Sequence, residues 1–180
     1  YYPERVDDVA WENDLTAFRA YGPALQETGE RAFGYDIWTK YNTTEPVVEA
    51  RYEGELNPDM KAKITELGKT DPKAAQELYR SVSYHVDHGN GLDCYKVGPT
   101  LGGGTTALMA GDTIIYPYCY ATQEILDNGP LRFTVKLVYN PLVVKGDSTI
   151  IETRIITLDA GSYCNKTVVS YTNLKETMPL

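Results

Sequence analysis

The sequence has little positive charge and no long hydrophobic run. Lys and Arg total 17 against 25 Asp and Glu, which gives a formal net charge of −8. Because domains that bind nucleic acids usually carry a basic patch, this balance argues against a phosphate-binding surface. No stretch approaches the roughly 18 apolar residues of a membrane-spanning helix. We therefore expect no nucleic-acid partner and no membrane span.

Familiar metal, redox and nucleotide motifs are also missing. Only three cysteines are present, Cys94, Cys119 and Cys164, and they lie far apart. Zinc and redox motifs need closely spaced cysteine pairs, so this spacing favours separate thiols over a disulfide or a zinc site. The glycine-rich residues 98–106 lack the lysine of a phosphate-binding loop and the spacing of a dinucleotide fingerprint, which excludes nucleotide binding there.

The chain does have enough apolar sequence for one folded domain. Its 180 residues are 42% hydrophobic, and tyrosine is the outlier, with 15 Tyr against 3 Phe and 2 Trp. A chain of this size buries roughly 70% of its unfolded surface, which is enough for a core. We expect residues 1–180 to form a single domain. We also expect that domain to be a piece of a longer protein, because the chain starts at Tyr1 without an initiator methionine.

Alternating apolar and polar residues predict a mainly β protein. Period-two patterning, β-branched residues and tyrosines mark six strands, at residues 15–21, 34–41, 113–121, 131–139, 147–158 and 166–172. The turn at residues 128–130, Asn-Gly-Pro, joins two of them closely. Antiparallel strands with short turns predict a β-sandwich, and the polar face of a sheet could hold a ligand.

Residues 58–80 break the β pattern and predict a short helical insertion. Asn57 and Asp71 can cap helices, and each is followed by a proline that suits a first helical turn. Gly68 is expected to end the first helix. The predicted helices cover residues 58–67 and 72–80.

A first charged cluster leads into the strand at 15–21. Residues 3–21 hold five acids, two arginines and Trp11. Arg19 lies inside an apolar strand, where a buried guanidinium needs a partner, and Glu12 and Asp14 are the nearby candidates. Arginine also binds a carboxylate through two parallel hydrogen bonds, including the carboxylate of a uronic acid. A solvated charged loop is the alternative.

Both histidines of the chain lie in a second cluster, residues 84–99. Histidine is the side chain type that titrates near neutrality, so the presence of His85 and His88 in one glycine-bearing loop indicates acid–base chemistry. Asp93 could orient an imidazole, and Tyr95 and Lys96 add proton donors. The alternative for this segment is a turn with incidental histidines.

A divalent metal at His85, His88 and Asp93, with Asp87 nearby, is a competing interpretation. The His-x-x-His pattern is weak alone, and the glutamate of the zinc-protease helix motif is absent. We therefore predict no metal and no other cofactor.

These clusters resemble, in order, an uncharacterised bacterial family of unknown function. The resemblance rests on residues 4–14, 17–25, 34–40, 84–99, 101–104, 129–132 and 158–162. Such proteins look like secreted or periplasmic members of polysaccharide-utilisation systems and are similar to the galactose-mutarotase-like supersandwich. The resemblance implies that fold, a carbohydrate substrate, often one containing uronic acid, and a periplasmic or extracellular location.

One candidate function is an enzyme that acts on uronic-acid-containing glycans. In a lyase, Arg19 or Arg5 would neutralise the uronate carboxylate and His85 or His88 would remove the C5 proton. Tyr95 or Tyr84 would then protonate the leaving oxygen. In a hydrolase, Glu12 and Asp93 would flank the glycosidic bond.

Two other functions stay open. A non-catalytic binding module would use Trp11 and Trp38 as platforms, with Arg19, Asp36 and Lys40 as polar contacts, and a scaffold domain would have its site elsewhere. The enzyme leads because residues 84–99 gather so many titratable groups. The predicted catalytic residues are His85, His88, Tyr95 and Lys96, and the predicted substrate contacts are Trp11, Glu12, Arg19, Trp38 and Asp93.

Overall fold

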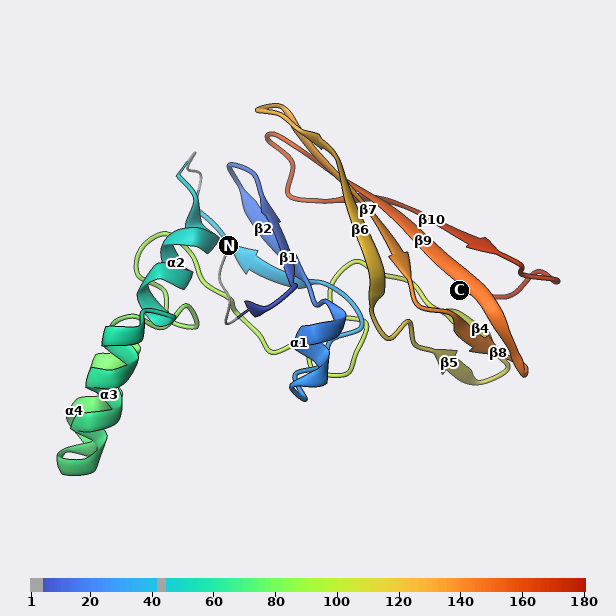
Figure 1. Cartoon of the computed structure of the whole chain (residues 1–180). Helices are drawn as coiled ribbons and strands as arrows, with labels where there is room; N and C mark the ends of the chain where they lie inside the picture. The colour runs from blue at the N-terminus through green and yellow to red at the C-terminus, as the bar shows by residue number, and fades with distance from the viewer. Residues whose placement is uncertain (1–4, 42–44) are drawn as a thin grey trace.

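The computed structural model describes residues 5–41 and 45–180, which form a mainly β body with a helical arm (Figure 1). The strands are β1 (Val9–Glu12), β2 (Thr16–Ala20), β3 (Asp36–Thr39), β4 (Leu108–Ala110), β5 (Thr113–Ile115), β6 (Tyr120–Asn128), β7 (Arg132–Tyr139), β8 (Leu142–Val144), β9 (Asp147–Asp159) and β10 (Lys166–Thr172). The helices are α1 (Pro23–Glu27), α2 (Val47–Glu55), α3 (Pro58–Thr70) and α4 (Pro72–Arg80).

The strands form two principal sheets that pack face to face. One sheet has the order β1-β2-β3, and the other has the order β10-β9-β7-β6 with β8 paired to β9. Every pairing between these strands is antiparallel. Trp11 and Phe18 from the small sheet meet Val135, Leu137 and Ile156 from the large sheet in one buried cluster. The mainly β, antiparallel prediction is therefore confirmed, and the arrangement is that of a β-sandwich.

The small sheet has two different faces because side chains alternate along its strands. Trp11 pairs with Phe18 across β1 and β2, and both side chains enter the core between the sheets. The neighbouring residue Arg19 pairs with Asp36 across β2 and β3 and faces the other way. This second face lies against α2 and residues 83–97 rather than against the large sheet.

The strand predictions are confirmed except around residues 113–121. Residues 166–172 match β10, and the predictions for β7 and β9 are correct to within one residue. Between 113 and 121 the chain instead ends β5 at Ile115 and begins β6 at Tyr120. Residues 121–128 of β6 are exposed throughout, so this edge strand has no apolar and polar alternation to detect.

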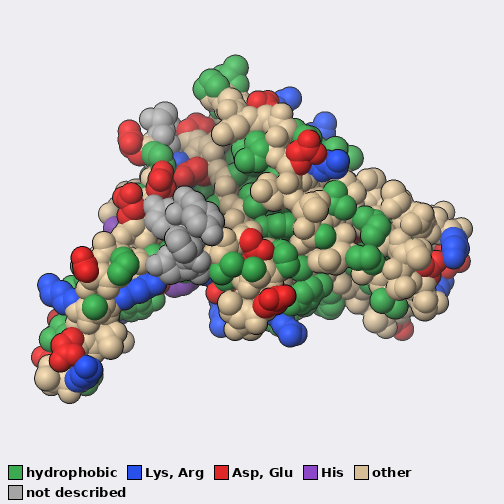
Figure 2. All heavy atoms as spheres, viewed as in Figure 1, with side chains coloured by type: hydrophobic (Ala, Val, Ile, Leu, Met, Phe, Trp, Pro, Cys, Tyr) green, Lys and Arg blue, Asp and Glu red, His purple; other side chains and the backbone are tan. Residues whose placement is uncertain are grey.

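The helical insertion is confirmed and is longer than predicted. Asn57 accepts a hydrogen bond from the Met60 amide at 3.0 Å, as a cap should. The expected end of α3 at Gly68 is wrong, because the helix continues to Thr70 and Gly68 faces Ala75 of α4. The α3–α4 arm carries charged side chains of both signs and projects from the body (Figure 2).

Helix α2 was not predicted, because its cap comes from a distant strand. The Glu12 carboxylate in β1 accepts hydrogen bonds from the amides of Val47 at 3.0 Å and Val48 at 3.4 Å. A negative side chain at the positive end of a helix also stabilises the helix dipole. No local pattern near residue 47 could reveal this contact.

None of the helices in the described residues is both long and apolar enough to cross a membrane. Cys94, Cys119 and Cys164 are all free thiols, and of the three only Cys119 is buried.

The packing between the two sheets predicts unequal effects for two leucines near the start and middle of β7. Leu137→Ala should lower the free energy of unfolding by about 2–5 kcal/mol, because it leaves a cavity in a packed core. Leu137 is 0% exposed, whereas Leu131 is 77% exposed. In the 180-residue chain, Leu131→Ala should change stability by less than about 0.5 kcal/mol. Urea denaturation measures both, and equal losses would contradict this packing.

Candidate functional site

Arg19 lies at the centre of the second face of the small sheet. Its side chain is 2% exposed. The guanidinium donates to the Asp36 carboxylate across the β2–β3 pairing and to the Tyr52 hydroxyl of α2 at 2.8 Å. It also donates to the Tyr21 hydroxyl at 3.1 Å and to Asp93 Oδ2 at 3.3 Å. One buried cation therefore joins β2, β3, α2 and the segment that contains both histidines.

Aromatic rings surround this guanidinium. Its central carbon lies 5.3 Å from the ring centroid of Trp38 and 5.9 Å from that of Tyr84. Trp38 and Tyr84 in turn stack on each other at 5.1 Å. Desolvated cation–π contacts of this kind stabilise a buried arginine.

The segment that carries Asp93 is held against the end of β3. The Thr39 amide donates to the Leu92 carbonyl at 2.9 Å, and the Asp93 amide donates to the Tyr84 carbonyl at 2.9 Å. Gly91 adopts a φ of +103°, and a Cβ there would lie 1.8 Å from the Thr39 carbonyl oxygen. A glycine at position 91 therefore lets this loop pass close to the end of β3.

Asp93 is a buried carboxyl group whose pKa lies close to neutral pH. Burial raises the pKa of Asp93 to about 6, and the nearby negative charge of Asp36 adds to the increase, while Arg19 and His85 oppose it. Burial also raises the pKa of Asp36. Two carboxyl groups that share one guanidinium, one of them titrating near pH 6, are the kind of arrangement found at functional sites.

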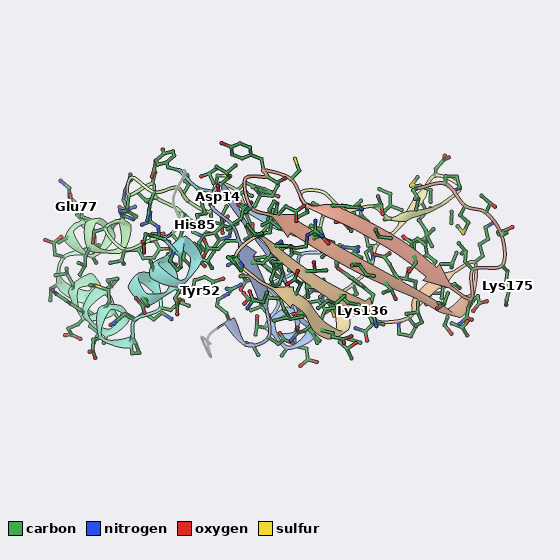
Figure 3. The ribbon with its side chains drawn as sticks, turned by 90° about the horizontal axis from the view of Figure 1, so that it is seen from above. Asp14, Tyr52, Glu77, His85, Lys136 and Lys175 are labelled. Carbon is green, nitrogen blue, oxygen red and sulfur yellow. The ribbon has the colours of Figure 1, made fainter. Side chains whose placement is uncertain are left out.

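His85 is the titratable group that lies beside Asp93 and remains open to solvent. Its Nδ1 lies 3.2 Å from the Asp93 carbonyl oxygen and 3.7 Å from Asp93 Oδ2. The imidazole is 48% exposed, so its other nitrogen can reach a ligand. Figure 3 shows His85 toward the helical end of the molecule, away from Lys136 of the large sheet.

These groups line one cavity of about 690 Å³. The Tyr95 hydroxyl in its wall donates to the Tyr35 carbonyl at 3.2 Å, and burial raises the pKa of Tyr95. Lys96 and Arg31 are exposed and lie on the same cavity. The cavity therefore combines a histidine beside a buried carboxyl group, a phenol and exposed positive charge.

The structure brings together five of the nine residues that the sequence singled out. Arg19, His85, Asp93, Tyr95 and Lys96 all line this cavity. Arg31 lines it as well, and sequence reasoning missed this residue. It precedes β3 without a motif of its own, so only the folded chain reveals its position.

The partners expected for Arg19 were wrong. Glu12 binds Lys40 at 2.8 Å and caps α2, and Asp14 accepts from the Gly161 amide at 2.7 Å. The cross-strand register supplies Asp36 instead.

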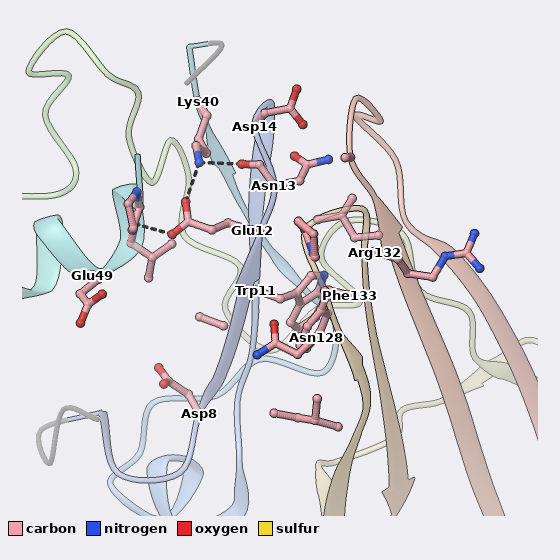
Figure 4. Close-up of a pocket in the computed structure, with 18 of the residues that line it drawn as sticks. Asp8, Trp11, Glu12, Asn13, Asp14, Lys40, Glu49, Asn128, Arg132 and Phe133 are labelled. Atoms are coloured by element: carbon pink, nitrogen blue, oxygen red, sulfur yellow. Dashed lines mark hydrogen bonds and ion pairs between the residues drawn. The ribbon is translucent and has the colours of Figure 1, made fainter. Parts of the chain in front are cut away.

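The two tryptophans and Glu12 lie apart from the surface of this cavity. Trp38 is 0% exposed and forms the layer beneath Arg19, and Trp11 is 3% exposed on the opposite face of the sheet. Neither indole ring is open as a stacking platform. Trp11 and Glu12 instead line a second cavity, of about 960 Å³ (Figure 4).

His88 and Asp87 contact residues outside this cavity. His88 Nε2 lies 2.9 Å from the Ser83 carbonyl oxygen, and Asp87 accepts from the Tyr41 hydroxyl at 2.7 Å. His88 does not line the cavity that contains His85. Within residues 5–41 and 45–180, no group of three His, Cys, Asp or Glu side chains is placed to hold a metal ion.

The fold and the cavity together define a β-sandwich protein with a buried arginine–carboxylate centre beside an exposed histidine. The chain belongs to the family described as a domain of unknown function, DUF4861, whose family model matches residues 1–180. It is 30% identical over 169 residues to the uncharacterized protein P7 of Formosa agariphila, a match that covers 90% of this chain. The chain spans only 37% of the length of that relative. No solved structure matches the chain.

The burial of Arg19 predicts a large and pH-dependent loss of stability in Arg19→Met. At neutral pH, removing the cation should cost about 3–5 kcal/mol, because Asp36 and Asp93 are left as uncompensated buried charges. The loss should shrink near about pH 4, where protonation of both carboxyl groups removes those charges. Urea denaturation at both pH values measures the difference.

Arg132→Met is the matched control. Arg132 pairs with Asp159 at 2.5 Å, but the two side chains are 54% and 48% exposed. Breaking an exposed pair should cost less than about 1 kcal/mol. Equal losses for the two variants, or a loss in Arg19→Met that does not change with pH, would contradict the arrangement described.

Proposed function

We propose that this chain carries the active site of an enzyme that cleaves uronic-acid-containing glycans by β-elimination. The observation that supports this most is the contact of exposed His85 with buried Asp93 inside a cavity of about 690 Å³ that also holds Tyr95 and Lys96. Elimination needs a base, an acid and a positive group for the uronate carboxylate, and these side chains supply all three.

The proposed reaction uses each group once. Lys96, together with Arg31, pairs with the uronate carboxylate and lowers the energy of the carbanion-like transition state. His85 removes the C5 proton, and the electrons of that C–H bond form the C4–C5 double bond. The C4–O bond then breaks, and Tyr95 donates its proton to the departing oxygen. Asp93 is a positioning residue that holds His85 in the tautomer with a free basic nitrogen.

The two arginines first considered as neutralising groups are better suited to structural work. Arg19 is enclosed by Asp36 and Asp93, and Arg5 is bound by Asp8 at 2.9 Å and by Glu30 at 3.2 Å. Their charges are already compensated. The exposed Lys96 and Arg31 therefore take this role in the proposal.

Hydrolysis and simple binding are less well supported by the same geometry. Glu12 and Asp93, the pair expected of a hydrolase, line different cavities, and Glu12 is bound to Lys40 and α2. A binding module would need open aromatic platforms, and both tryptophans are buried. A scaffold domain would not need an exposed histidine placed against a carboxyl group with a raised pKa.

The remaining parts of the proposal rest on the sequence resemblance. They are a galactose-mutarotase-like supersandwich fold, membership of a polysaccharide-utilisation system and a periplasmic or extracellular location. The antiparallel sandwich is consistent with that fold.

The central test compares the two histidines in the full-length protein. The full-length protein and its two histidine variants are each incubated with polygalacturonate, alginate and glycosaminoglycans. The ultraviolet absorbance of the unsaturated product is then followed. His85→Ala should lower kcat by about 10²–10⁴-fold, the range for loss of a general base. His88→Ala should retain activity, because His88 lies outside the cavity. No unsaturated product from the parent protein on any of these substrates, or equal loss in both variants, would contradict the proposal.

The raised pKa of Asp93 predicts how activity depends on pH. Only ionised Asp93 stabilises the protonated His85 that forms in the reaction, so kcat should fall as pH drops through about 6. Asp93→Asn should lower kcat and shift that acidic inflection, because the amide does not titrate and no longer couples to the base His85. An inflection that stays at the same pH in Asp93→Asn would show that Asp93 does not contribute to it.

A further inference from the structure

The outer edge of β1 has no strand beside it in the described part of the chain. β1 lies at the end of the β1-β2-β3 sheet and pairs with β2 alone. The Asn13 amide donates to the Thr16 carbonyl, which fixes the alternation of hydrogen-bonded pairs along β1. Trp11 therefore directs its backbone groups toward β2, whereas Ala10 and Glu12 direct theirs away from it. These two positions can each pair with an added strand.

A groove runs along this open edge. It is the cavity of about 960 Å³ in Figure 4, with α2 on one side and the adjoining ends of β6 and β7 on the other. Ala10, which is exposed, has only a methyl group and leaves space beside the backbone. The groove therefore gives a chain access to the backbone of β1.

The wall formed by β6 and β7 is apolar and uncovered. Ile125 of β6 pairs with Val135 of β7, a core residue that is 0% exposed, yet Ile125 itself is 53% exposed. Leu131, at the turn before β7, is 77% exposed. The large sheet is thus wider than the small sheet that covers it, and its inner face remains open beyond β1. One more strand beside β1 would cover this region.

The charged groups that line the groove are largely compensated within the chain. Arg5 pairs with Asp8, Lys40 pairs with Glu12, and Arg132 pairs with Asp159. The groove therefore offers backbone hydrogen bonds and apolar contacts more than free charge. This is the chemistry of strand addition, in which the main chain gives affinity and alternate side chains fill apolar pockets.

We propose that the β1 edge is a docking site for an extended segment of the same full-length polypeptide that lies outside these 180 residues. The matched relative supports this occupant, because 37% of its length corresponds to this chain and the rest is additional polypeptide. The added strand pairs with Ala10 and Glu12 and places alternate apolar side chains against Ile125, Leu131 and Phe133. It extends the small sheet to four strands. The proposal is independent of the catalytic function proposed above.

Amide hydrogen exchange, followed by NMR, tests this docking in the 180-residue chain and in the full-length protein. In the full-length protein the Ala10 and Glu12 amides should exchange at least about tenfold more slowly, since an amide bonded within a sheet exchanges only by opening. The Trp11 amide, already directed at β2, serves as an internal reference and should change less.

Leu131→Ser and Leu126→Ser form the matched pair of variants in the full-length protein. Both leucines are exposed, but only Leu131 lines the groove. Leu131→Ser should reverse most of the added protection of Ala10 and Glu12, and Leu126→Ser should preserve it. Equal exchange in the short and full-length proteins would overturn the proposal. Protection that increases with protein concentration would also overturn it, by assigning the groove to a second copy.

Discussion

The burial of one guanidinium organises the site on which the proposed function depends. Arg19 is held in β2 by the alternation of the strand, and its charge must be compensated where it lies. Asp36 comes from the adjacent strand, Tyr52 from α2, and Asp93 from the segment beyond the helical arm. These elements are distant in sequence, and the shared cation requires them to meet. The same contacts place His85 at the surface of the cavity that Arg19 underlies.

The two faces of the small sheet therefore contact different parts of the molecule. One face supplies Trp11 and Phe18 to the core of the sandwich, and the other supplies Arg19 and Asp36 to the buried charge cluster. Trp38 belongs to the second face, where its ring packs against the Arg19 guanidinium. The apolar core and the residues of the proposed chemistry thus lie on opposite faces of a single sheet. A change on the core face can weaken the fold without altering the charges around Asp93.

Local sequence patterns predicted much of the fold and part of the site. The long strands β7, β9 and β10 alternate clearly, and Asn57 and Asp71 mark their helices, so these elements could be found. β6 could not be found, because an exposed edge strand has no apolar and polar alternation. α2 could not be found either, because its cap comes from Glu12 in a distant strand. The grouping of His85 with Asp93 followed from their closeness in sequence. The pairing of Arg19 with Asp36 did not, because it depends on strand register, which the sequence left undetermined.

The pKa of Asp93, measured directly, tests the central claim that a buried, arginine-bound carboxyl group is poised for use beside His85. The side-chain carboxyl carbon of Asp93 can be followed by ¹³C NMR as the pH is varied, with Asp93→Asn to assign the signal. We expect a midpoint at about 6, because burial and the negative charge of Asp36 raise this pKa. A midpoint near about 4, the ordinary value for an exposed aspartate, would show that Asp93 is neither buried nor coupled as described. The proposed role for His85 would then lose its physical basis.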